Sequence, residues 1–339
     1  MIEKKLAKLP RARLAHLPTP IDPLPRLSEE IGGPAILVKR DDCTGLGMGG
    51  NKVRKLEFLL GDALAKGADA VVSGGVTQSN HIRQTAAACA KLGLECHLAV
   101  MEGRVPEVDA DYYDTGNIFL DRLFGAHLET VDWRADRNAL LPAMAERLAD
   151  EGKTPYIVPY GGSNGVGTMG YVQFVVELLS QLDQMDRRIG AIVHASGSAG
   201  TQAGILAGLT ALAPDLPVIG IDIDAEPKRV LADVTRLYQE TCDFLEIAER
   251  LPEDRIEVIG GYAGDGYGLT TDGMVEAVDL AARLEGLMLD PVYAGKGLAG
   301  LLGLIRSGRF ESEDQILFLH TGGTPALFAY RSAFGTESR

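Results

Sequence analysis

Two lysines follow a glycine turn in the segment Gly49-Gly50-Asn51-Lys52-Val53-Arg54-Lys55. The flexible turn predicts that Lys52 lies at the start of a helix, with Lys55 one helical turn later. A lysine at a helix end is usually a solvated charge. In a desolvated pocket beside a second positive charge, its amine would instead be reactive enough to attack a cofactor carbonyl. Lys55 could supply that charge or bind a phosphate.

A run of polar residues, SGGVTQSNH, occupies positions 73–81 between an apolar segment and a helical one. Its side chains and free backbone N–H groups are suited to bind a carboxylate, and Ser79 could also carry a proton. Capping of the following helix by Ser79 or Asn80 is the structural alternative.

A second glycine loop, Ser196-Gly197-Ser198-Ala199-Gly200-Thr201-Gln202, follows an apolar run and precedes an Ala/Gly/Leu helix. Its small side chains allow a phosphate close to the backbone, and Ser198 and Thr201 add hydroxyl donors. The loop lacks the G-x-x-x-x-G-K-[ST] pattern of a nucleoside triphosphatase. A dinucleotide site, with Asp222 or Asp224 on the ribose, stays open as an alternative.

Two tyrosines near polar turns are the remaining candidates. Tyr267 and Tyr293 are either core aromatics with a satisfied hydroxyl or acid/base groups facing a pocket. Tyr293 ends the segment 290–293, and the polar turn 321–325 follows later in the chain.

Composition limits the partners. The 339 residues are 46% apolar and 24% charged, which is typical of a globular protein. Because 33 basic residues face 47 acidic ones, for a net charge of −14, we expect no nucleic-acid partner. The four cysteines form no C-x-x-C pair and no Cys/His spacing suited to zinc, so we expect reduced thiols, no disulfide framework and no metal.

The basic N-terminus lacks the apolar core of a secretory signal, and no stretch reaches the ~18 apolar residues of a membrane span. We therefore expect a cytoplasmic protein with no membrane partner.

Short β-branched runs alternate with helical stretches, which predicts an α/β fold with parallel sheets covered by helices. The expected strands are 36–39, 70–72, 97–101, 156–159, 191–195, 218–223 and 316–320. The expected helices include 55–66, 82–92, 138–151 and 169–185. The first fifty residues read as an extended, Pro-rich arm with one strand. We predict a large domain, 1–52 plus 160–339, and a small inserted α/β domain, 53–159.

The chain resembles the pyridoxal-phosphate family that contains D-cysteine desulfhydrase, L-cysteate sulfo-lyase and 1-aminocyclopropane-1-carboxylate deaminase. The resemblance rests on five segments in order over nearly the whole chain: GGNKVRKLEF, GGVTQSNHIRQTAA, SGSAGTQAG, DPVYAGK and HTGGTPALFAY. It implies the tryptophan-synthase-β type of fold, with two open α/β lobes, pyridoxal 5′-phosphate between them, and a homodimer.

The resemblance also implies roles for the candidate residues around the cofactor. Lys52 would hold the cofactor covalently as an imine, and Asn80 would lie against its ring. Thr324 would approach the pyridine nitrogen. The phosphate would be held by Lys55 with the loop residues Ser198, Ala199, Gly200 and Thr201.

The substrate would be a small amino acid. By the same resemblance, its carboxylate would be taken by Gln78, Ser79 and Asn80, with Asn51 nearby. Lys52 would be the base at the α-carbon, with Ser79 or a tyrosine, Tyr267 or Tyr293, as the alternative for a D-amino acid.

Two positions separate branches of the family. The deaminase branch carries a glutamate after Pro-Val-Tyr and a leucine after Gly-Gly, whereas this chain has Ala294 and Thr324. Alanine offers no carboxylate to a protonated ring nitrogen, so the resemblance favours a carbon-sulfur lyase that releases pyruvate, ammonium and a sulfur group. Ala294 also departs from the hydroxyl residue common in the desulfhydrases.

The segment 39–46 resembles the sulfo-lyase branch, which favours L-cysteate with sulfite release; D-cysteine with sulfide release is the alternative. His81, Arg83 and Thr44 are candidate donors to a sulfonate, although a His and an Arg at a helix start are often structural.

Two other classes stay open on the residues alone. A NAD-dependent oxidoreductase would use Ser196 to Gly200 as its fingerprint but would leave Lys52 without a role. A non-catalytic amino-acid or phosphate-binding protein would bind its ligand without forming product.

Overall fold

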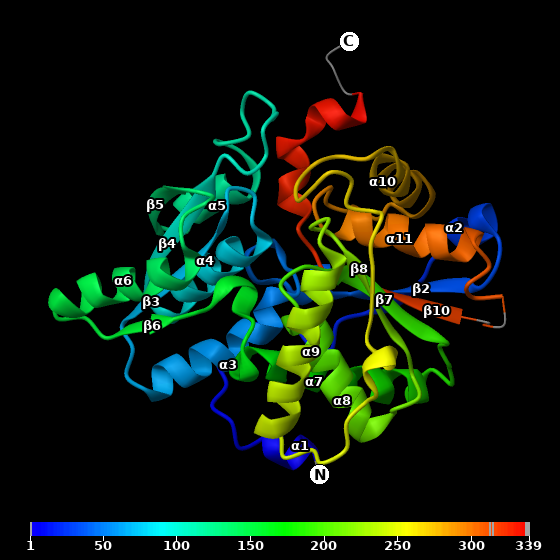
Figure 1. The fold of residues 1–339 in the computed structure, drawn as a ribbon, viewed down its shortest axis with the longest axis horizontal. Helices are drawn as coiled ribbons and strands as arrows, with labels where there is room; N and C mark the ends of the chain where they lie inside the picture. Colours follow the sequence, from blue (N-terminus) through cyan, green and yellow to red (C-terminus); the bar gives the residue numbers. More distant parts are fainter. Residues whose placement is uncertain (1, 312, 314, 336–339) are drawn as a thin grey trace.

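The computed structural model describes residues 2–311, 313 and 315–335, and within them it contains two sheets on either side of a central region (Figure 1). The larger sheet has the order β1 (Ile21–Pro23), β2 (Ala35–Arg40), β10 (Gln315–His320), β7 (Ala191–Ser196), β8 (Val218–Asp222), β9 (Glu257–Ile259). The smaller sheet has the order β5 (His127–Asp132), β4 (Glu95–Glu102), β3 (Ala70–Val76), β6 (Pro155–Ile157). All neighbouring strands are parallel except β1 and β2. The predicted parallel α/β fold is confirmed.

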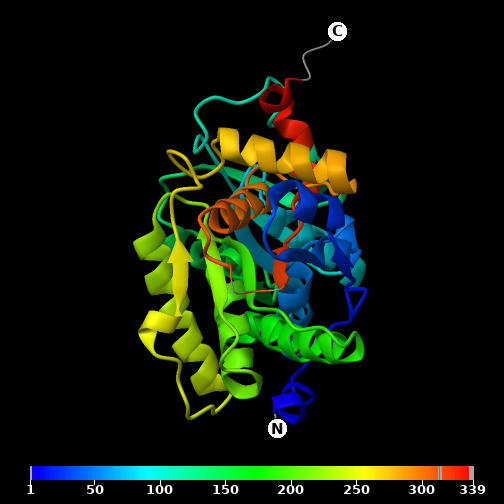
Figure 2. The same ribbon diagram turned by 90° about the vertical axis from the view of Figure 1, so that its right-hand side faces the viewer.

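Helices cover both faces of the larger sheet (Figure 2). One face carries α1 (Ile2–Leu6), α7 (Gly165–Gln184), α8 (Gly200–Leu212) and α9 (Pro227–Phe244). The other face carries α2 (Pro25–Ile31), α10 (Asp272–Glu285) and α11 (Ala294–Arg306). Strand β10 shows why its sequence is continuously apolar: Leu317 and Leu319 pack toward the first layer, whereas Ile316 and Phe318 pack toward the second.

The smaller sheet is covered in the same way. On one face lie α3 (Lys52–Ala65), α4 (Asn80–Leu92) and α5 (Gly116–Leu123). The other face packs against α6 (Arg137–Asp150). All four strands of this sheet fall within residues 53–159, and those of the larger sheet fall outside them. The domain boundaries themselves stay a prediction, because α3 packs against both α4 and α7.

Three strands were not predicted: β1, β5 and β9. All three lie at sheet edges, and β1 and β9 have only three residues each. The first fifty residues also differ from the expected extended arm, because they form α1 and α2 and contribute two strands. Among the described helices, none has both the length and the apolarity required to cross a bilayer.

The crossing of α3 and α7 depends on a glycine. A Cβ atom at Gly170 would overlap the carbonyl oxygen of Arg54 and lie 2.7 Å from the amide nitrogen of Lys55. The two helices therefore touch backbone to backbone just after Lys52, and this contact fixes the start of α3.

We expect Gly170→Ala to lower the free energy of unfolding by about 1–3 kcal/mol, because the methyl group cannot be accommodated without moving α3. Gly273→Ala in α10 is the matched control, since its nearest neighbour would lie 4.0 Å away. There we expect a change of at most about 0.5 kcal/mol, because Gly273 lies in the first turn of α10 and its added methyl group would make only an ordinary contact. Urea denaturation of both variants measures the difference, and equal shifts would contradict the close helix crossing.

Candidate active site

A cavity of about 450 Å³ lies where strands of both sheets end. Residues 74–76 and Met101 line it from the smaller sheet, and residues 195–196 line it from the larger one. The starts of α3, α4 and α8 also face it. Because parallel strands place their carboxyl ends on one edge, the loops that follow them are the usual ligand-binding positions of such sheets.

Lys52 is the first residue of α3 and lines this cavity, as the glycine turn predicted. Its Nζ donates to the Ser198 hydroxyl at 3.2 Å. Burial disfavours the charged ammonium and lowers the Lys52 pKa to about 8. A much larger fraction of this amine is therefore neutral at pH 7 to 8 than of a solvent-exposed lysine.

Lys55 lies one turn later and is fully buried. Its Nζ donates to the Gly161 carbonyl oxygen at 3.1 Å and to the Ser163 hydroxyl at 3.4 Å. Burial, and then repulsion by Lys52, lower the Lys55 pKa well below its usual value. Within the described residues, no carboxylate lies within ion-pair distance of either amine. A bound anion would stabilise the charged form of both.

The glycine loop before α8 leaves room for such an anion. A Cβ atom at Gly200 would lie 2.9 Å from the Lys55 Nζ and 2.6 Å from the Ser163 hydroxyl, so any side chain there would fill the space beside the amine. Ala199 adopts φ 64° just before the helix, and Gly200 and Thr201 begin its first turn, whose N–H groups attract anions. Lys55 and residues 198–201 therefore fit a phosphate group.

Asn80 begins α4, and both polar atoms of its side chain form hydrogen bonds. Its Nδ2 donates to Asn51 Oδ1 and to the Thr321 carbonyl oxygen, both at 3.3 Å. Its Oδ1 accepts hydrogen bonds from Arg83 and Gln84. Asn51 in turn donates to the Thr201 hydroxyl at 3.1 Å, so these amides join the starts of α3, α4 and α8.

Ser79 caps α4, and its hydroxyl oxygen accepts from the backbone N–H groups of residues 81 and 82. Its own proton is free to be donated into the cavity that it lines. Both roles considered for Ser79 are thus compatible. Gln78 differs: its side chain donates to the carbonyl oxygens of Tyr112 and Thr115 and is absent from the cavity lining. Its contact with a substrate stays a prediction.

Tyr267 and Tyr293 both line the cavity, and their hydroxyl groups are hydrogen-bonded to each other. Burial raises the pKa of both phenols above the usual value of 10. Both are therefore protonated at neutral pH, and the pair is suited to hold or donate a proton. Asp290 accepts three backbone N–H groups at the start of α11 and so fixes the position of Tyr293.

Thr324 lies outside the cavity lining, and its hydroxyl donates to the Met288 carbonyl oxygen at 3.4 Å. Thr321, three residues earlier, does line the cavity. Ala294 is buried at the first position of α11. The role of Thr324 toward a ring nitrogen stays a prediction.

Two of the three expected sulfonate donors, Arg83 and Thr44, instead form hydrogen bonds within the fold. Arg83 is fully buried and donates to Asn117, Asn80 and the carbonyl oxygens of the turn before α3. Thr44 is buried and bonded to the backbone of Gly50. Only His81 lines the cavity. Its Nε2 lies 3.0 Å from the Ser73 hydroxyl, and its buried Nδ1 has no hydrogen-bond partner among the described residues.

Several cavity residues were not predicted from the sequence, among them Arg104, Arg137 and Tyr160. Arg104 forms an ion pair with Asp224 at 2.6 Å and lies over the Tyr267 ring. Arg137 lies over the Tyr160 ring, 5.6 Å from its centre, and among the described residues no carboxylate lies within ion-pair distance of it. These residues belong to no motif, and only the fold brings them to the site.

A buried ion-pair network holds α3 from its other side. Arg54 contacts both carboxylate oxygens of Asp41, at 2.8 and 2.9 Å, and both of Glu177 in α7. Lys39 also donates to Glu177, and Tyr171 donates to Asp41. Lys52 lines the cavity, whereas the Lys55 amine reaches Gly161 and Ser163 beside it. The network therefore holds the helix turn from which both lysines extend.

The comparisons with known proteins agree with this geometry. Residues 12–322 match the family described as pyridoxal-phosphate dependent enzyme. A crystal structure of an ACC deaminase homologue is 38% identical, with a TM-score of 0.87 over 96% of this chain and 95% of that one. A fungal L-serine ammonia-lyase from Rhizomucor miehei is 19% identical, with a TM-score of 0.66 over 95% of this chain and 97% of that one. At that identity the likeness shows the fold alone.

The family excludes the dinucleotide alternative, and Asp224 is engaged by Arg104 and Arg229 instead. The resemblance seen in the sequence is thus confirmed at the level of family, fold and cofactor. The chain belongs to the pyridoxal-phosphate dependent enzymes, with an ACC deaminase-like fold, and its cofactor is pyridoxal phosphate.

Proposed function

We propose that the chain is a carbon-sulfur lyase that eliminates the β-sulfur group of a cysteine-like amino acid, with L-cysteate as substrate and sulfite as leaving group. One observation carries the proposal: the amine of Lys52 and the guanidinium of Arg137, which lacks a carboxylate partner among the described residues, line the same cavity. The amine can serve the α-carbon, and the guanidinium can bind a second anionic group on the same substrate.

The chain's own residues have separable roles in this reaction. Bound pyridoxal phosphate supplies an electron sink for the electron pair left at the α-carbon. Lys52 takes the α-proton, for which its lowered pKa is suited. The Ser79 hydroxyl, whose oxygen caps α4, donates its proton to the substrate carboxylate. Arg137 binds the sulfonate, and the protonated Tyr267–Tyr293 pair closes the cavity beside it.

The overall reaction balances without an oxidant or reductant. L-Cysteate and water become pyruvate, ammonium and sulfite. Ring opening of the kind suggested by the name of the ACC deaminase homologue is less well supported, because the buried Ala294 offers no carboxylate to the ring nitrogen. The homodimer and the cytoplasmic location stay predictions.

The assay that tests the proposal supplies L-cysteate and D-cysteine separately to the cofactor-loaded protein and follows pyruvate, sulfite and sulfide. We expect equal amounts of pyruvate and sulfite from L-cysteate. Sulfide from D-cysteine alone would make the enzyme a desulfhydrase. If neither substrate gives pyruvate, the carbon-sulfur lyase proposal is wrong, although the cofactor assignment is unaffected.

Arg137→Gln separates sulfonate recognition from the chemistry. We expect KM for L-cysteate to rise about 10- to 100-fold, which corresponds to the ~1.5–3 kcal/mol of a hydrogen bond to a charged group. Arg134→Gln is the matched control: Arg134 is exposed three residues away and lies over Trp133. An unchanged KM in Arg137→Gln would contradict the assigned role of Arg137.

The lowered pKa of Lys52 predicts the pH dependence of cofactor capture. Only the neutral amine reacts with the cofactor's carbonyl group, so the rate of capture by the cofactor-free protein should rise with pH and level off above a midpoint of about 8. Stopped-flow absorbance near ~410 nm follows the reaction. A rate that still climbs about sevenfold between pH 9 and 10, as for an ordinary lysine with a pKa of about 10.4, would contradict the desolvated site.

A further inference from the structure

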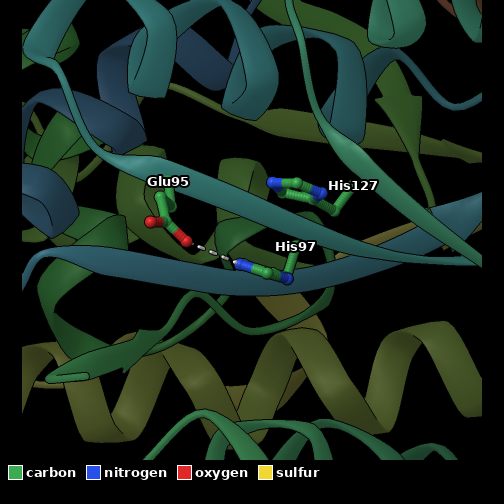
Figure 3. A group of neighbouring side chains, drawn as sticks. All are labelled: Glu95, His97 and His127. Carbon is green, nitrogen blue, oxygen red and sulfur yellow. Dashed lines mark hydrogen bonds and ion pairs between the residues drawn. The ribbon is translucent and has the colours of Figure 1, made fainter. Parts of the chain in front are cut away.

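A second cluster of ligand-type side chains lies at the opposite end of the small sheet from the cavity (Figure 3). Glu95 and His97 are two residues apart on β4 and therefore share one face of the strand. His127 begins β5 and is paired in register with His97. One ligand atom from each side chain lies within 4.8 Å of those of the other two. Met101, which lines the cavity, is near the far end of β4.

The three side chains are suited to bind a zinc-type ion. Two imidazoles and a carboxylate are preferred zinc ligands, and bonds of about 2.0–2.2 Å place tetrahedral ligand atoms about 3.3–3.6 Å apart. The Glu95 Oε2 already lies 3.3 Å from the His97 Nε2. The two rings are stacked with centres 4.6 Å apart and an angle of 17° between their planes, so their lone pairs run nearly parallel. The exposed His127 side chain must rotate for both rings to point at one ion.

The surroundings favour this use of Glu95. Its other oxygen, Oε1, accepts a hydrogen bond from Lys153 at 2.6 Å, which turns Oε2 toward His97. His97 is half-buried on a paired strand, so its backbone is fixed by neighbours on both sides. A carboxylate held by an outer partner is the arrangement that orients metal ligands in proteins. The exposed side of the cluster leaves a fourth position for water.

We propose that Glu95, His97 and His127 bind one divalent transition-metal ion of the zinc class, in a site distinct from the cofactor cavity. This site differs from the expectation of no metal, which rested on the cysteines and on Cys/His spacing. His97 and His127 lie thirty positions apart in the sequence, and the parallel pairing of β4 and β5 brings them together. Since β5 is an edge strand, the ion would join it to its neighbour and stabilise the small sheet. The ion takes no part in the proposed lyase reaction.

The test is calorimetric titration of Zn²⁺ into the cofactor-loaded protein after treatment with a chelator. We expect one equivalent to bind at this site, and affinity to fall by at least about tenfold in His97→Gln and in His127→Gln. Zinc should also raise the melting temperature of the parent protein but not of His127→Gln.

Two control variants test whether zinc binds to other exposed side chains instead. His16→Gln removes another exposed histidine, and Cys43→Ser removes the exposed thiol; both should bind zinc as the parent does. The proposal is overturned if the parent binds no zinc, if the two β-strand variants bind it unchanged, or if either control variant abolishes binding. Lyase activity is a separate readout, so failure of the metal site leaves the proposed function intact.

Discussion

The site depends on two amines, one lining the cavity and one buried beside it, and within the described part of the chain no carboxylate lies close enough to neutralise either. Lys52 and Lys55 lie one helical turn apart, and the positive charge of Lys52 adds to burial in lowering the pKa of Lys55. Such an arrangement is unfavourable on its own, because burying a charge without a partner costs several kcal/mol, on the order of the desolvation penalty for an ion. It becomes favourable when a phosphate and a carbonyl group arrive together, which is what pyridoxal phosphate provides.

The fold tolerates the two buried amines because the opposite face of α3 is held by ion pairs and by a close helix contact. Arg54 is held by two carboxylates, from the loop after β2 and from α7, and Gly170 lets α7 approach the same turn of the helix. Breaking one member of such a network leaves an uncompensated charge, so the network resists rearrangement. The start of α3 therefore stays in place even though its cavity face is electrostatically unfavourable before the cofactor binds.

Much of the fold was predictable, for reasons visible in particular strands. The central strands β7, β8 and β10 are apolar on both faces and short, which is the pattern of parallel strands between helix layers. The edge strands lack this pattern: in β5 four of the six residues are exposed and none is buried, and β9 has only three residues. Lys52, Ser79 and the loop before α8 were found because glycine and polar residues cluster locally. Arg104, Arg137 and Tyr160 were missed because only the tertiary fold joins them. For Arg83 both a structural and a ligand-binding role stayed open, because a buried and a ligand-binding arginine look alike in sequence.

The central claim is that Lys52, and not its neighbour, carries the cofactor. Borohydride reduction of the cofactor-loaded protein, followed by proteolysis and mass spectrometry, identifies the lysine that becomes covalently labelled. We predict that the phosphopyridoxyl group is found on Lys52, with Lys55 unmodified because it faces the phosphate. Label on Lys55, or on the buried Lys296, which donates to the Ala263 carbonyl oxygen, would contradict the account.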